Sequence, residues 1–143
     1  MKRLALATIL VSLWAPSALA AGPLKIEAPW VREAPPTARV LAGYATFRNA
    51  GAEPDALVAV KTEVADRVEI HTMAMRGGVM RMQAIPFLEI PAKGTAKLVP
   101  GGAHLMIYDP KRPLRDGETV PMTFVFRGGT ELRLFVPVRK VQS

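Results

Sequence analysis

Residues 68–85 read VEIHTMAMRGGVMRMQAI, two alternating runs on either side of the pair Gly77-Gly78. Two consecutive glycines suit the tight two-residue turn of a β-hairpin, because both central positions of that turn need positive φ. The stretch therefore predicts two antiparallel strands, 68–75 and 79–85, whose register the turn fixes. In that register Arg76 pairs with Val79, Met75 with Met80 and Met73 with Met82. Alternation then places on one face of the hairpin His71, Met73, Met75, Met80 and Met82.

Short apolar or alternating runs recur along the rest of the chain, separated by Pro, Gly and other turn residues. No window shows a long 3.6-residue repeat, and the only helix expected is one turn at Thr62–Arg67, capped by Thr62. Pro29 is expected to confine the first strand to a sheet edge, since proline cannot donate to a ladder. Frequent turns between short strands predict an antiparallel β-sandwich. Besides the hairpin, we expect strands at 26–32, 40–49, 57–61, 88–90, 95–99, 104–108, 119–126 and 132–138.

The first twenty residues have the features of an export signal. A charged start, Met1-Lys2-Arg3, precedes an apolar run over 4–14 and an A-x-A site at Ala18-Leu19-Ala20. The apolar run is shorter than the roughly 20 residues needed to span a bilayer. We therefore expect cleavage of 1–20, a periplasmic single domain at 21–143 and no stable membrane insertion after cleavage. No cysteine follows the apolar run, which excludes a lipid attached through one.

The composition limits the classes of partner and of site. The formal net charge is +7, or +5 once Lys2 and Arg3 leave with the signal, and the basic residues are dispersed. Nucleic-acid binding would call for a basic patch with interleaved aromatic residues, so no nucleic-acid partner is expected. The chain has no cysteine, so no disulfide supports the fold. In an oxidising compartment thioethers persist as ligands where thiolates would be oxidised.

The stretch from His71 to Met106 holds both histidines and five of the seven methionines. His104 and Met106 lie two residues apart on an expected strand, so they share a face, while Leu105 and Ile107 point to the core. Neutral, soft thioethers suit Cu(I), whereas structural zinc would want cysteine or more histidine and a blue-copper centre needs a thiolate. The joint arrangement favours as ligands His71, Met82, His104 and Met106. Four other methionines fit core packing or the rim of the site as well as they fit metal binding: Met73, Met75, Met80 and Met122.

At these residues the sequence resembles the periplasmic copper chaperone family (PCuAC), which helps to metallate the CuA centre of cytochrome c oxidase. The family motif is a His or Met, ten residues, a Met, twenty-one residues and His-x-Met, and here it runs from His71 through Met82 to His104-Leu105-Met106 without a gap. The surroundings match as well, at 28–32, 42–44, 68–72, 78–82, 100–106, 113–117 and 120–123.

The resemblance implies a cupredoxin-like Greek-key sandwich or barrel holding one Cu(I) ion near the surface through His71, Met82, His104 and Met106. It also implies transfer to an apo acceptor, cytochrome c oxidase subunit II or an assembly factor. Some members bind a second copper, as Cu(II), on a His- and Met-rich tail. This chain ends Arg139-Lys140-Val141-Gln142-Ser143, so no second copper bound by such a tail is expected.

The sequence thus favours a monomeric copper carrier that is not an enzyme. Copper storage or tolerance and a metal-free β-sandwich binding module stay open as alternatives. An enzyme would need a general base formed by a histidine and a carboxylate, such as His71 or His104 with Glu69 or Asp109. No nucleophile stands in the sequence order of a recognisable catalytic triad with them. A redox copper enzyme has to hold both oxidation states, which a methionine-rich ligand set disfavours.

Overall fold

Every helix or strand that the computed structural model assigns within residues 22–141, the part of the chain it describes, is a β-strand. The strands are β1 Leu24–Arg32, β2 Val40–Asn49, β3 Asp55–Thr62, β4 Ala65–Arg76, β5 Val79–Ile85, β6 Leu88–Ile90, β7 Thr95–Leu98, β8 His104–Pro110, β9 Thr119–Phe126 and β10 Glu131–Arg139. The expected signal, 1–20, lies outside the described residues. Within those residues no helix is long and apolar enough to cross a membrane.

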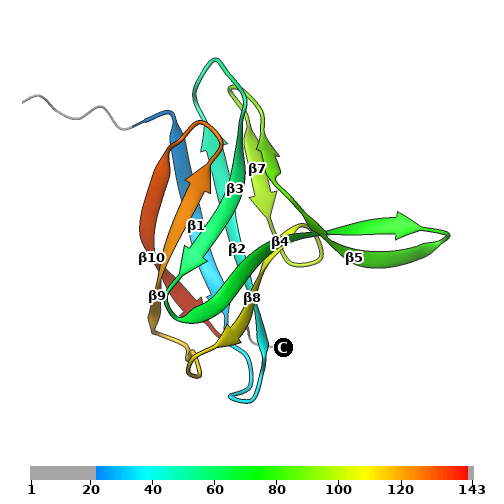
Figure 1. Ribbon diagram of the computed structural model, residues 1–143, viewed down its shortest axis with the longest axis vertical. Coiled ribbons are helices and arrows are strands. Elements are labelled where there is room, and N and C mark those ends of the chain that lie inside the picture. The colour runs from blue at the N-terminus through cyan, green and yellow to red at the C-terminus, as the bar shows by residue number, and fades with distance from the viewer. Residues whose placement is uncertain (1–21, 142–143) are drawn as a thin grey trace, which may run out of the picture.

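The strands form two layers (Figure 1). One layer has the order β5-β4-β8-β2-β1, with β7 continuing along β2 beyond β8, and the other has the order β10-β9-β3-β6. A short parallel pairing of β1 with β10 joins the layers, and the other neighbours are antiparallel. The chain crosses between layers at β2–β3, β3–β4, β5–β6, β6–β7 and β8–β9, as Greek-key connections do. The predicted all-β Greek-key sandwich is confirmed.

The core lies between the two layers and is built from the inward side chains of each strand. Phe47 of β2 packs edge-on against Phe124 and Phe126 of β9, with ring centroids 5.9 and 6.0 Å apart. Leu105 and Ile107 of β8 are fully buried, as their alternation with His104 and Met106 predicted. Removing one such aromatic side chain costs about 3–5 kcal/mol in typical cores. The inward faces thus supply the stability, which leaves the outward face of β8 free for function.

The prediction that Pro29 confines its strand to a sheet edge holds only in part, because β1 ends its layer but pairs with β10 at Val31 and Arg32. β1 lies between β2 and β10 in the strand order, and its register with β2 shifts between Glu27 and Trp30. Ala28 sits in that bulge with φ of 47°. A bulge leaves residues outside the ladder, which tolerates the missing N–H of proline inside a sheet.

The predicted helical turn at Thr62–Arg67 was wrong, because β3 ends at Thr62 and β4 begins at Ala65. The Thr62 hydroxyl donates to the carbonyl of Pro121 at 2.8 Å and accepts from the Val64 N–H at 3.4 Å. A threonine whose hydroxyl bonds the backbone two residues on favours a tight turn as readily as a helix cap. Here it joins the two layers through a turn.

The predicted hairpin is confirmed with its register. Gly77 and Gly78 have φ of 57° and 77°, and Met73 pairs with Met82 and Met75 with Met80. The distal part of β4 and β5 projects from the sandwich as an arm (Figure 1). The turn therefore decides which side chains the arm presents on each face.

We predict that Gly78→Ala loosens the arm while the sandwich keeps its stability. A Cβ in the left-handed region costs about 1–2 kcal/mol, and the arm carries little of the core. Amide hydrogen exchange should accelerate within 72–85, with the midpoint of thermal unfolding nearly unchanged. Gly22→Ala is the control, since a Cβ meets nothing within 4 Å at either position but only Gly78 has φ in the left-handed region. An unchanged exchange rate at 72–85 would contradict this role of the turn.

Candidate metal centre

The candidate ligands gather on the outward face of the layer that contains β4, β5 and β8. His71 of β4 stands directly opposite His104 of β8, and Met73 stands opposite Met82 of β5. Met106 stands between Glu69 of β4 and Ala42 of β2. Directly opposed residues on adjacent strands point to the same face, so three strands contribute to one surface. Non-local pairing of β4 with β8 is what brings the two halves of the motif together.

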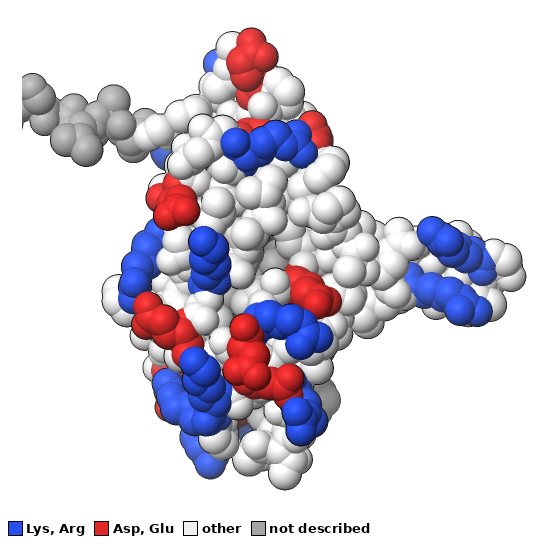
Figure 2. All heavy atoms as spheres, in the orientation of Figure 1, with Lys and Arg blue, Asp and Glu red and all other residues white. Residues whose placement is uncertain are grey.

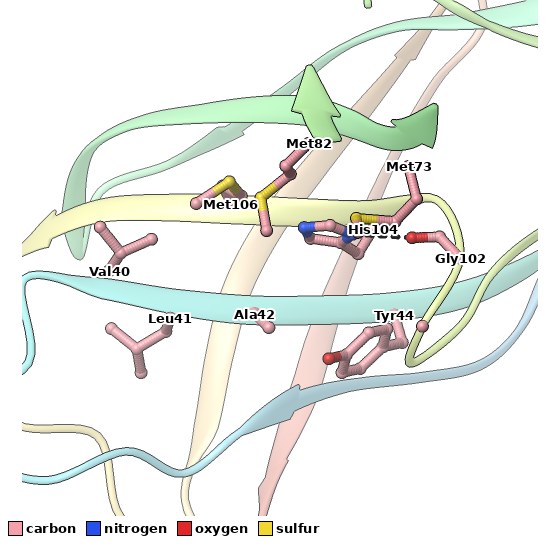
Figure 3. Close-up of a pocket in the computed structure, with 10 residues that line it drawn as sticks. Val40, Leu41, Ala42, Tyr44, Met73, Met82, Gly102, His104 and Met106 are labelled. Carbon is pink, nitrogen blue, oxygen red and sulfur yellow. Dashed lines mark hydrogen bonds between the residues drawn. The ribbon is translucent and has the colours of Figure 1, made fainter. Parts of the chain in front are cut away.

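A cavity of about 480 Å3 opens on this face. Its sulfur and nitrogen atoms come from Met73, Met82, His104 and Met106, and the ring of His104 points toward the sulfurs of Met82 and Met106 (Figure 3). The remaining wall comes from Val40, Leu41, Ala42, Tyr44, Gly101 and Gly102. Three of the four predicted ligands therefore line one cavity, and the rest of its lining is largely apolar.

His71 lies beside this cavity and does not line it. Its side chain is only 12% exposed, and its ring centroid is 6.1 Å from that of His104. The two rings are tilted by 32° from one another. The structure thus brings the fourth predicted ligand next to the other three, at the inner edge of the site.

His104 is held with one nitrogen free. Its Nδ1 is 2.8 Å from the carbonyl oxygen of Gly102, so Nδ1 carries the proton and donates it. Nε2 then keeps its lone pair. A metal-binding histidine commonly donates its other ring N–H to a carbonyl in this way, which fixes its tautomer and orientation.

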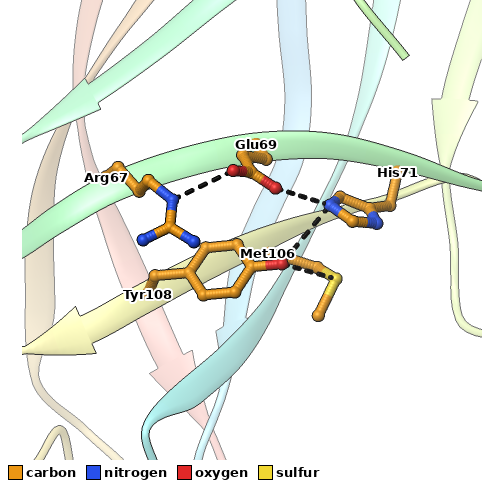
Figure 4. Close-up of polar contacts among 5 residues, drawn as sticks. All are labelled: Arg67, Glu69, His71, Met106 and Tyr108. Atoms are coloured by element: carbon orange, nitrogen blue, oxygen red, sulfur yellow. Dashed lines mark hydrogen bonds and ion pairs between the residues drawn. The ribbon is translucent and has the colours of Figure 1, made fainter. Parts of the chain in front are cut away.

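His71 is held by the opposite nitrogen. Its Nε2 is 2.8 Å from Glu69 Oε2 and donates to that carboxylate, while Nδ1 is buried and has no hydrogen-bond partner within residues 22–141 (Figure 4). A buried ring nitrogen without a partner is uncommon and calls for an explanation, of which an ion is one. Each imidazole therefore offers one lone pair, which fits a soft cation.

A polar cluster behind the ligands orients them (Figure 4). Arg67 donates to Glu69 at 2.9 Å, and its guanidinium lies 4.0 Å from the centroid of the Tyr108 ring. The Tyr108 hydroxyl lies 3.4 Å from His71 Nε2 and donates to the Met106 sulfur at 3.6 Å. A thioether has a second lone pair, so this contact orients Met106 and leaves it able to bind an ion.

The electrostatics of this cluster keep Glu69 ionised. Hydrogen bonds from His71 and Arg67 hold the pKa of the Glu69 carboxyl below its ordinary value. Burial, together with the nearby Glu69 carboxylate, raises the pKa of the Tyr108 hydroxyl, which therefore stays protonated as a donor. An ionised carboxylate against one imidazole N–H strengthens the ligand character of the other nitrogen.

The sequence interpretation missed the positioning roles of Glu69, Tyr108 and Gly102. Glu69 was considered only as part of an enzyme's base pair, although it lies two residues before His71, and Tyr108 lies two residues after Met106. Alternation along β4 and β8 could have placed both on the ligand face. Asp109, the other carboxylate considered, accepts a hydrogen bond from Arg39 at 2.6 Å instead.

Within residues 22–141 there is no group of three or more His, Cys, Asp or Glu side chains that could hold a metal ion.

The methionines that were left undecided fall into three environments. Met122 is 1% exposed and belongs to the core. Met73 lines the cavity, directly across from Met82. Met75 and Met80 form an exposed pair further out on the arm.

We predict opposite tautomers for the two histidines of the metal-free protein. At a pH where both rings are neutral, His104 should carry its proton on Nδ1 and His71 on Nε2, which long-range 15N–1H correlation spectra distinguish. Glu69→Gln should weaken the preference at His71 and leave His104 unchanged. The matched control is Glu27→Gln, which removes a carboxylate of β1 that accepts a hydrogen bond from Arg48 of β2. Identical tautomers at both rings would contradict the assigned donors.

Comparison with known proteins agrees with this architecture. The family model described as "Putative lipoprotein LpqE-like" matches residues 24–138. "Putative lipoprotein Lxx21020" of Leifsonia xyli subsp. xyli is 29% identical over 117 residues, which cover 81% of this chain and 69% of that protein.

Solved structures of PCuAC domains are similar in sequence and in fold. The apo PCuAC domain from PmoF1 is 32% identical with a TM-score of 0.70, over 84% of this chain and 96% of that one. The solution structure of CuI-DR1885 from Deinococcus radiodurans is 34% identical with a TM-score of 0.66, over 87% of this chain and 81% of that one. This chain belongs to the LpqE-like family, which is the family of the PCuAC domains.

Proposed function

We propose that this protein is a Cu(I) carrier that binds one ion through His71, Met82, His104 and Met106. The observation that supports the proposal most is the ligand face itself. Two imidazoles on adjacent strands each keep one lone pair, and two thioethers lie beside them at an open cavity. The copper-bound relative, CuI-DR1885, is similar over most of the chain.

The donor set favours monovalent copper over other metals. Thioethers are neutral and soft, so they bind Cu(I) well and bind zinc, magnesium or calcium poorly. Neutral ligands also bind without losing protons, unlike thiols. Copper therefore enters as cargo and keeps its oxidation state. Only metal–ligand bonds form and break, and no covalent bond of the protein changes. For the same reason we propose a carrier and not an enzyme.

Release follows from the exposure of the site. Met82 is 51% exposed, so an acceptor's ligand can reach the ion before the two imidazoles let go. Thiolates bind Cu(I) more tightly than thioethers because they are anionic, which gives ligand exchange its direction. We propose an acceptor with such thiolates, the CuA centre of cytochrome c oxidase subunit II or an assembly factor. A periplasmic location agrees with the relatives' description as lipoproteins and with a methionine-based site.

We predict one tight equivalent of Cu(I) for the monomeric protein in competition with a chromophoric chelator under anaerobic conditions. Met82→Leu/Met106→Leu should lose this equivalent, because leucine keeps the volume and removes the sulfur. Met122→Leu is the matched control, since that methionine lies in the core. Equal binding by both variants, or no binding by the wild type, would contradict the copper site. It would favour the alternative of a metal-free β-sandwich binding module.

We predict further that the bound ion moves to a thiolate acceptor. The loaded protein is mixed with the soluble apo CuA domain of cytochrome c oxidase subunit II under reducing conditions, and copper is measured in each protein after separation. Delivery predicts that most of the copper leaves with the acceptor. Copper retained by this protein against excess acceptor would instead favour storage or tolerance.

A further inference from the structure

The hairpin arm, residues 72–83, reaches beyond the candidate metal centre. It comprises the distal part of β4 and most of β5 and projects from the sandwich body (Figure 1). The arm contains four methionines and two arginines but no acidic residue. Only Met82 is used by the proposed inner site, and Met73 lines the same cavity. The outer pair, Met75 and Met80, has no role in that site.

The arm has two chemically different faces. The register places Met73, Met75, Met80 and Met82 on one face, which is a ladder of thioethers. The opposite face carries Arg76, whose guanidinium donates to Gln83 at 3.2 Å, and Arg81. Lys and Arg atoms are conspicuous on the projecting arm, and Asp and Glu atoms are not (Figure 2). The positive charges therefore lie on the face that does not carry the sulfurs.

The outer methionines are not core filler. Met75 is 64% exposed and Met80 is 51% exposed, whereas Met122 in the core is 1% exposed. A solvent-facing side of a hairpin ordinarily carries polar residues, because exposed apolar area gains nothing from folding. Two opposed thioethers on an exposed arm therefore call for a function of their own.

The geometry of this pair suits a soft ion. Directly opposed residues have Cβ atoms about 4.5–5.5 Å apart, and methionine has three rotatable bonds with which to bring its sulfur onto a shared ligand. Successive pairs along the ladder lie about 6.7 Å apart, twice the rise per residue. From the tip inward the ladder runs Met75/Met80, then Met73/Met82, then His71/His104.

We propose that Met75 and Met80 form an outer site for a soft monovalent metal ion, with Met73 as the next ligand inward. Two neutral thioethers alone make this site weaker than the inner one, so the ion is held there briefly. In each step one metal–sulfur bond forms as another breaks, and no proton or electron is transferred. Binding at the outer site is independent of the inner site, whereas its use as an entry and exit path rests on the proposed function.

The test uses Ag(I), a redox-inert soft monovalent ion, and the protein labelled with 13C at its methionine methyl groups. The first equivalent should shift the Met82 and Met106 methyl signals. Further Ag(I) should shift those of Met75 and Met80, with the Met122 methyl as an unchanging reporter of the fold. Met75→Leu/Met80→Leu should lose the later process and keep the first, and Val79→Leu, on the opposite face of the arm, should lose neither.

A second variant separates the outer site from the inner one. In His71→Ala/His104→Ala the Met75 and Met80 signals should still shift with Ag(I), although the tight equivalent is gone. If those signals never move in the wild type, or stop moving in this variant, the outer site is refuted. If they move in the wild type and in this variant while Met82 and Met106 stay still, the outer site stands and the inner assignment fails.

The exchange role is tested by the rate at which Ag(I)-loaded protein yields its ion to a small thiol. Met75→Leu/Met80→Leu should slow that transfer, with the affinity of the inner site unchanged. Leucine keeps the apolar surface of the arm, so a rate equal to that of the wild type would show that the outer thioethers serve only as apolar contact area and would overturn the path.

Discussion

The register of β4 against β8 is the constraint on which the candidate site depends, because it sets His71 directly opposite His104. The same register sets Ile70 opposite Leu105 and Val68 opposite Ile107, whose side chains point to the core. A slip by one residue would turn the imidazoles inward and the aliphatic side chains outward. Burial of those aliphatic residues therefore stabilises the ligand geometry as well as the fold.

Stability and metal chemistry occupy opposite faces of the same strands. The inward faces supply a close-packed core, and the outward face of β4, β5 and β8 carries neutral nitrogen and sulfur donors. The imidazoles are oriented by a carboxylate and a carbonyl, whereas the thioethers sit on flexible side chains. This combination of a fixed inner half and an adaptable outer half suits an ion that has to be held and then released.

Much of this arrangement is local in the sequence and was predictable from it. Gly77-Gly78 fixes the hairpin register, and alternation alone puts His104 and Met106 on one face. The bulge at Pro29 was not predicted and the turn at Thr62 was mispredicted, because the first depends on pairing with β2 and the second on the carbonyl of Pro121. Alternation could have placed Glu69 and Tyr108 on the ligand face, but their contacts across the strands need the pairing of β4 with β8, which no local pattern reveals.

Copper K-edge X-ray absorption on the protein loaded with one equivalent of Cu(I) tests the four-ligand site most directly. We expect a reduced-copper edge and a first shell of imidazole nitrogens and thioether sulfurs, with the sulfur contribution lost in Met82→Leu/Met106→Leu. A shell of nitrogen and oxygen only, or a spectrum that this variant leaves unchanged, would contradict the assignment of His71, Met82, His104 and Met106 to one copper site.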